Sequence, residues 1–117
     1  ASTPSGALLV LLRTVFNQIV QLRALQATRG TLDYLLCNSL QDRATAISNA
    51  ADEARRTDGL PDHLMNVVVE SVGTARRCAR ASGPEAIVTL DIAIGIHKAN
   101  LALVAAYARK RDEFAYQ

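Results

Sequence analysis

The sequence predicts an all-α protein that folds as an antiparallel, up-and-down four-helix bundle. Two observations lead to this fold class: apolar residues recur at helical spacing in four segments, and residues typical of helix ends separate these segments. A third is the composition, which is rich in alanine but has only two Phe, three Tyr and no Trp, and so disfavours a β-sheet. We expect a single domain, residues 1–117, because a chain of this length is typical of one hydrophobic core.

The first predicted helix spans residues 7–28 and is apolar along one side. Its inward positions repeat every three or four residues: Leu8, Leu12, Val15, Ile19 and Leu22. Gly30 can adopt a left-handed conformation after a helix end and Thr31 can cap the next helix, so we expect a tight turn. The alternative is one continuous helix through Gly30. The apolar stripe shifts by roughly a quarter turn between the two segments, which favours the break.

The second predicted helix spans residues 32–57 and ends at the strongest break in the chain. It turns several alanines inward, which lets a neighbouring helix approach closely, together with larger residues: Leu32, Leu36, Leu40 and Ile47. The break is DGLPD, residues 58–62, where Gly59 can end the helix and Asp62 can cap the following one.

The third predicted helix spans residues 63–81 and the fourth spans residues 84–113. The third carries its apolar residues on one face: Leu64, Met65, Val68, Val72, Ala75 and Ala79. Its three consecutive valines are poor helix formers, so tertiary packing has to hold the segment helical. Pro84 suits the first position of the fourth helix, with Glu85 in its first turn.

The fourth predicted helix has more apolar surface than one position in a bundle requires. At about 100° per residue, a polar line forms on the predicted solvent face: Asp91, Gly95, Lys98, Ala102 and Arg109. One apolar stripe can fill the core: Leu90, Ile94, Leu101 and Val104. A second stripe is the candidate oligomer interface: Val88, Ile92, Ile96, Leu103 and Tyr107. We expect another subunit to cover it, because wide apolar surface is normally buried.

His97 and Asn100 are predicted to form a buried polar pair on the core side of the fourth helix. They lie among leucines and isoleucines, so we expect a neighbouring polar group to hydrogen-bond them. The alternative is a phosphoacceptor role for His97, because histidine-containing phosphotransfer domains are helical bundles with a basic residue near the histidine. Lys98 is such a neighbour, but the usual His-x-x-Lys-Gly order is missing.

The sequence contains no pattern that predicts catalysis, a cofactor or a metal site. Di-iron bundles need Glu-x-x-His pairs, and none of the four glutamates has a histidine three residues later: Glu53, Glu70, Glu85 and Glu113. Gly-rich phosphate loops and nucleophile motifs are also missing from the sequence. We therefore expect a protein that is not an enzyme.

Charge and hydropathy do not predict a nucleic-acid or membrane partner. The net charge is +2, but the basic residues collect at helix ends, so a bundle would divide them between its two poles. Residues 86–108 are long enough to span a bilayer, yet Asp91 and Lys98 would each cost about 2.5–3.5 kcal/mol near its centre. Cys37 and Cys78 are expected to be free thiols in a reducing cytoplasm, although one bridge between them remains open.

These observations together predict a cytoplasmic, self-associating bundle whose work is protein–protein interaction. Such a protein could be a scaffold, an adaptor, a chaperone-like protein or a coat subunit, with a second copy or another helical protein as its partner. Two alternatives are phosphotransfer signalling through His97 and a small-molecule sensor with a pocket between helices near Asn17 or Asn100.

Overall fold

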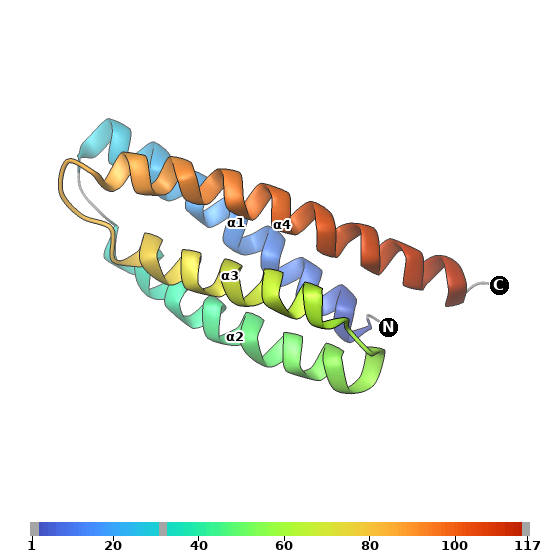
Figure 1. Ribbon diagram of the computed structural model, residues 1–117. Helices are drawn as coiled ribbons and strands as arrows, with labels where there is room; N and C mark the ends of the chain where they lie inside the picture. Colours follow the sequence, from blue (N-terminus) through green and yellow to red (C-terminus); the bar gives the residue numbers. More distant parts are fainter. Residues whose placement is uncertain (1–2, 31–32, 116–117) are drawn as a thin grey trace.

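The computed structural model describes residues 3–30 and 33–115, with side chains as far as Arg111. The described residues form four helices: α1 (Pro4–Arg29), α2 (Tyr34–Asp58), α3 (Asp62–Ala79) and α4 (Ala86–Ala115). Successive helices run antiparallel, and α1 packs against both α2 and α4, as α3 also does (Figure 1). The predicted all-α four-helix bundle is confirmed. It is elongated, with extents of 51 × 24 × 20 Å.

The first helix begins earlier than predicted and ends at the predicted glycine. It starts at Pro4 because the Thr3 hydroxyl accepts a hydrogen bond from the Gly6 N–H at 3.0 Å, which caps the helix. At the other end, Gly30 is left-handed with a φ of 69°, and its N–H donates to the Gln26 carbonyl. The predicted helix end at Gly30 is therefore confirmed, and a continuous helix through Gly30 is wrong.

The other three helices begin at different residues from those predicted. Thr31 and Leu32 lie outside the described residues, and the residue that caps α2 is Asp33, whose carboxylate accepts the Leu36 N–H at 3.0 Å. The N-cap of α3 is Pro61, without a side-chain cap bond, so Asp62 is the first helical residue and not the cap.

The connection between α3 and α4 is longer than predicted. The third helix ends at Ala79, where Arg80 leaves the helical conformation. Gly83 has a φ of 73° and its carbonyl accepts the Ala86 N–H, so Pro84 lies in a turn before α4 and not in its first turn. The fourth helix consequently begins and ends two residues later than the predicted 84–113.

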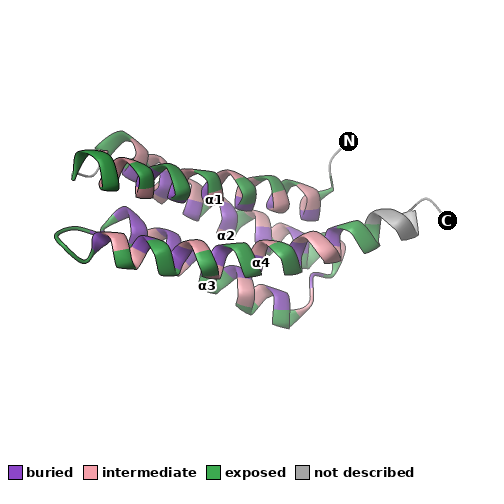
Figure 2. Cartoon of the chain, turned by 90° about the horizontal axis from the view of Figure 1, so that it is seen from above, coloured by how far each residue is buried: buried purple, intermediate pink, exposed green. Residues whose placement is uncertain are grey.

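The core runs along the axis of the bundle and contains the predicted apolar faces (Figure 2). In α1 the five predicted inward residues are each at most 1% exposed: Leu8, Leu12, Val15, Ile19 and Leu22. The predicted close approach at α2 is also present, because Ala44, Ala51 and Ala54 are buried. Packing holds the valine-rich part of α3 helical, since Val68 and Val72 are both buried.

Asp58, at the end of α2, ties three helices together at one pole of the bundle. Its carboxylate accepts hydrogen bonds from the Ser5 N–H at 3.0 Å and the Ser5 hydroxyl at 2.8 Å. Its main-chain carbonyl accepts from the Tyr107 hydroxyl at 3.1 Å, and Arg111 pairs with the carboxylate. The carboxylate thus satisfies one of the free N–H groups at the start of α1, where negative charge is favourable.

Candidate functional site

The outward face of α4 is an apolar surface that the chain itself does not cover (Figure 2). Its large side chains are more than half exposed: Val88 59%, Ile92 58% and Leu103 52%. Small exposed residues complete this face, which we call the outer stripe: Val88, Ile92, Gly95, Ala99, Ala102 and Leu103. Because these positions recur at intervals of three or four residues, they form one continuous strip along the helix.

Two members of the predicted interface do not belong to the outer stripe, and three small residues join it: Gly95, Ala99 and Ala102. Ile96 is half-buried and faces the groove between α3 and α4. Tyr107 is also half-buried, because its ring packs against the chain's own core and its hydroxyl donates to Asp58. Val88, Ile92 and Leu103 are the predicted interface residues that remain open.

The charged residues of the predicted polar line lie at the edge of this face, whereas Gly95 and Ala102 of that line belong to the outer stripe. Asp91 and Lys98 are exposed, as predicted, and Asp91 pairs with Arg23 of α1 over 2.8 Å between Nε and Oδ1. Asp91 therefore borders α1 at one edge of the outer stripe. Leu90 and Val104, from the predicted core stripe, are fully buried.

Gly95 in the middle of the outer stripe has no packing role within the chain. A Cβ atom built on it would have no atom within 4 Å to meet. A glycine inside a helix destabilises it by about 0.5–1 kcal/mol relative to alanine. Contacts within the chain therefore do not account for a glycine at this position.

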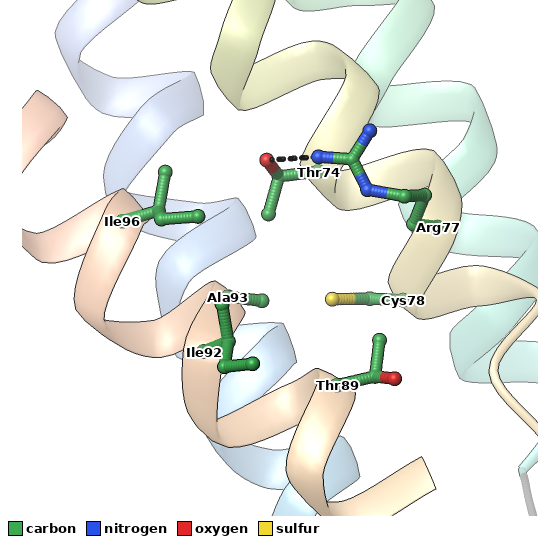
Figure 3. A pocket seen from close by; sticks show the side chains of 7 residues that line it. All are labelled: Thr74, Arg77, Cys78, Thr89, Ile92, Ala93 and Ile96. Carbon is green, nitrogen blue, oxygen red and sulfur yellow. Dashed lines mark hydrogen bonds between the residues drawn. The ribbon is translucent and has the colours of Figure 1, made fainter. Parts of the chain in front are cut away.

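A half-open pocket of about 230 Å³ lies beside the outer stripe, between α3 and α4 (Figure 3). Ile92 and Ile96 line it from α4, and the Cys78 sulfur points across it toward Ala93. The Thr74 hydroxyl accepts a hydrogen bond from Arg77 at 3.0 Å and is thus already paired. The pocket is therefore mainly apolar and suits an apolar group.

A buried polar cluster, the α3–α4 node, joins the two helices behind this face. His97 is 1% exposed and its Nε2 donates to the Ser71 carbonyl at 3.0 Å; since a carbonyl can only accept, the proton is on Nε2. Asn100 is 6% exposed, and its amide nitrogen donates to Ser71 Oγ at 2.9 Å and Glu70 Oε1 at 3.0 Å. The two residues are thus buried and hydrogen-bonded, and their partners fix the height of α4 against α3.

This environment does not suit a phosphoacceptor. A phosphotransfer histidine needs an exposed nitrogen, whereas the His97 ring is buried and its Nε2 is bonded to α3. Opening the node would leave the Ser71 and Asn100 polar groups without partners. The structure therefore gives no support to phosphotransfer through His97.

The buried His97 of the α3–α4 node is expected to make the free energy of unfolding depend on pH. Burial lowers the pKa of the His97 imidazole below its ordinary 6.5, although the Ser71 bond and nearby Glu70 act in the opposite direction. The unfolded chain binds this proton near pH 6.5 and the folded chain only at lower pH. The contribution of His97 to the free energy of unfolding is therefore fully present above pH 6.5. It decreases as the pH falls, by up to about 1.4 kcal/mol per pH unit.

Urea unfolding between pH 7.5 and about 5.5 measures this effect. We expect the free energy of unfolding of the wild type to decrease over this interval more steeply than that of His97→Gln, which lacks the titrating ring. All other titrating groups are common to the two proteins, so the difference between the curves isolates His97. Equal slopes would contradict the prediction.

Both cysteines are buried free thiols. Burial raises the pKa of the Cys78 thiol to about 11, so it stays protonated at neutral pH although it lines the pocket. Desolvation also raises the pKa of Cys37.

Two helices are long and apolar enough to cross a membrane by length and composition alone: Pro4–Arg29 and Ala86–Arg111. A core helix of a water-soluble protein or a signal sequence passes the same test. In each helix 28% of the most apolar window is buried within the bundle. Among the described residues no group of three or more His, Cys, Asp or Glu side chains is placed to hold a metal ion.

The fold and the site define a four-helix bundle with an uncovered apolar helix face backed by a buried polar node. No protein-family model matches the sequence, and no curated protein and no solved structure matches it significantly.

Proposed function

We propose that the protein is a non-enzymatic interaction protein that self-associates through the outer stripe of α4. The observation that supports this proposal is the exposure of Val88, Ile92 and Leu103 on one helix face, with no charged side chain between them. Burying such surface stabilises a complex by about 25 cal/mol per Å² before the costs of association. A scaffold, adaptor, chaperone-like protein or coat subunit would use a face of this kind.

The dimensions of the outer stripe suit a helix as the binding partner. From Val88 to Leu103 the strip extends roughly 22 Å at 1.5 Å per residue. An apolar strip of this length and width is what an amphipathic helix covers when it packs along another helix. The adjoining pocket widens the surface toward α3 and can receive an apolar side chain of the partner.

The exposed large apolar residues on the other helices do not form a strip of comparable length. Two of them lie together at the start of α2 and one lies on α3: Tyr34, Leu35 and Val69. On α1, Val10 and Val20 are exposed, but Arg13, Asn17 and Gln21 are exposed on the same face. Isolated apolar residues among polar ones are normal on protein surfaces. The outer stripe is therefore the surface to which we assign the interaction.

The sensor alternative is less well supported. A pocket between helices is present, but its walls are mainly apolar and it lies away from the residues expected to supply polar groups. Asn17 is exposed on α1, and the Asn100 amide already donates to groups of α3. We therefore treat the pocket as part of the interaction surface.

We also propose a cytoplasmic location. Two buried cysteines that remain unbridged suit a reducing compartment. Asp91 and Lys98 border the outer stripe and disfavour its insertion into a bilayer.

The solution mass of the intact protein tests this function. The chain has a mass of 12.6 kDa. We expect light scattering to give at least twice this value at micromolar concentrations, and the mass to fall on dilution, because association follows mass action. A mass that stays at that of one chain at every concentration would remove self-association.

A further inference from the structure

We propose that the occupant of the outer stripe is a second copy of this chain, with its α4 antiparallel to the first and crossing it near Gly95. This inference rests on the proposed self-association and specifies its geometry. Most homo-oligomers are two-fold dimers in which one patch meets its own copy, so the patch has to be complementary to itself. The outer stripe meets this requirement in shape and in charge.

Shape complementarity follows from the order of large and small residues. If the two-fold axis passes between residues 95 and 96, Val88 lies opposite Leu103 of the partner subunit. Ile92 then lies opposite Ala99 of the partner subunit, so a large side chain meets a small one. Gly95 lies at the crossing point, where its lack of a side chain lets the two helices approach closely.

The pocket between α3 and α4 lies on the α3 side of the outer stripe, which in the proposed dimer is next to the α3 side of the partner subunit. Its lining includes Thr89 and Ile92, next to Val88. A two-fold axis perpendicular to the helices keeps the α3 side of one α4 next to the α3 side of the other. Leu103 of the partner subunit therefore lies at the end of the pocket, where an apolar side chain fills space that the chain itself leaves open.

The charges at the other edge select the antiparallel orientation. Asp91 and Lys98 both lie on the α1 side of the stripe, and the two-fold axis brings Asp91 to within about two residues, roughly 3 Å along the helix, of Lys98 of the partner subunit. The reciprocal pair forms at the same time. In a parallel two-fold pair the α1 side of one α4 would lie next to the α3 side of the other, so Asp91 and Lys98 would not meet across the contact.

Both side chains are available for this contact. Asp91 is 53% exposed although it pairs with Arg23. Lys98 is exposed and makes no ion pair within the part of the chain that the structure describes. Exposed pairs add little affinity, so these charges determine orientation more than strength.

Cysteine cross-linking of the full-length protein tests the orientation. Val88→Cys and Leu103→Cys each change an exposed side chain, so we expect both variants to fold normally. The two proteins are mixed, left to exchange subunits and oxidised gently. We expect a mixed disulfide between positions 88 and 103, because opposed positions bring the two β-carbons within bonding reach. Peptide mass mapping identifies the bridge and separates it from the buried Cys37 and Cys78.

Each outcome decides a different part of the proposal. Val88→Cys alone and Leu103→Cys alone are expected to stay uncross-linked, and Val10→Cys, equally exposed on α1, serves as the control. Self-links within each single variant would show a parallel pair, which overturns the antiparallel arrangement and leaves self-association through α4 intact. A dimeric mass without any link at these positions would overturn the use of α4. A monomeric mass would remove both proposals.

Discussion

The Ile92→Arg variant is expected to be a monomer under conditions in which the wild type self-associates. Ile92 lies near the middle of the outer stripe, 58% exposed in the single chain, and a partner would bury it. Arginine at this position would place a guanidinium without an acidic partner in an apolar contact. In a two-fold dimer both subunits carry the substitution, so this unfavourable burial of charge occurs twice. We expect the dissociation constant to rise by about a hundredfold or more, measured by light scattering over a dilution series.

The matched control is Val10→Arg. Val10 is 59% exposed and Ile92 is 58% exposed, but Val10 lies on α1 among polar residues. We expect this variant to keep the wild-type mass, and both variants to keep the wild-type free energy of unfolding of the single chain within about 0.5 kcal/mol. An equal loss of association in the two variants would show that added charge, and not the position on α4, is responsible.

The helical pattern of the sequence was sufficient to predict the core. The inward face of α1 could be identified because its five apolar positions recur every three or four residues with polar residues opposite. The turn at Gly30 was predictable as well, since a left-handed residue after a helix end is a local property. Both features depend on residues close together in the chain.

The side of α4 that faces solvent could not be predicted in full. The sequence shows two apolar stripes on this helix, and local spacing alone does not define where the covered surface ends within the second stripe. Contacts with the other helices decide between them: Leu90 and Val104 pack inside, while Tyr107 turns inward because Asp58 accepts its hydroxyl. Gly95 and Ala102 were expected on the solvent face, whereas Ala99 joins the exposed stripe only after this rotation is known.

Hydrogen bonds between residues far apart in the chain could not be predicted from the sequence either. Asp58 reads as part of a turn, yet its carboxylate bonds to Ser5, 53 positions earlier in the chain. The buried pair of His97 and Asn100 was expected from its apolar neighbours, but its partner Ser71 was not. That pairing depends on the rotation of α3 relative to α4, which no local pattern specifies.

Among substitutions of polar residues on α4, the removal of the Asn100 amide is expected to reduce the free energy of unfolding most. Its nitrogen donates to Ser71, Glu70 and the Val67 carbonyl, all from α3. Asn100→Ala leaves the buried Ser71 hydroxyl without this partner and opens a small cavity. We expect the free energy of unfolding to fall by about 2–3 kcal/mol in urea titrations at pH 7.5.

Two further variants separate the causes of this loss. Asn17→Ala removes an exposed asparagine of α1 and is expected to change stability by less than about 0.5 kcal/mol. Asn100→Leu fills the volume and removes only the polar contacts, so its cost, about 1–2 kcal/mol, measures the hydrogen bonds alone. If Asn100→Leu were as stable as the wild type, the node would not stabilise the fold. Its role would then be to fix the register between α3 and α4, and with it the position of the outer stripe.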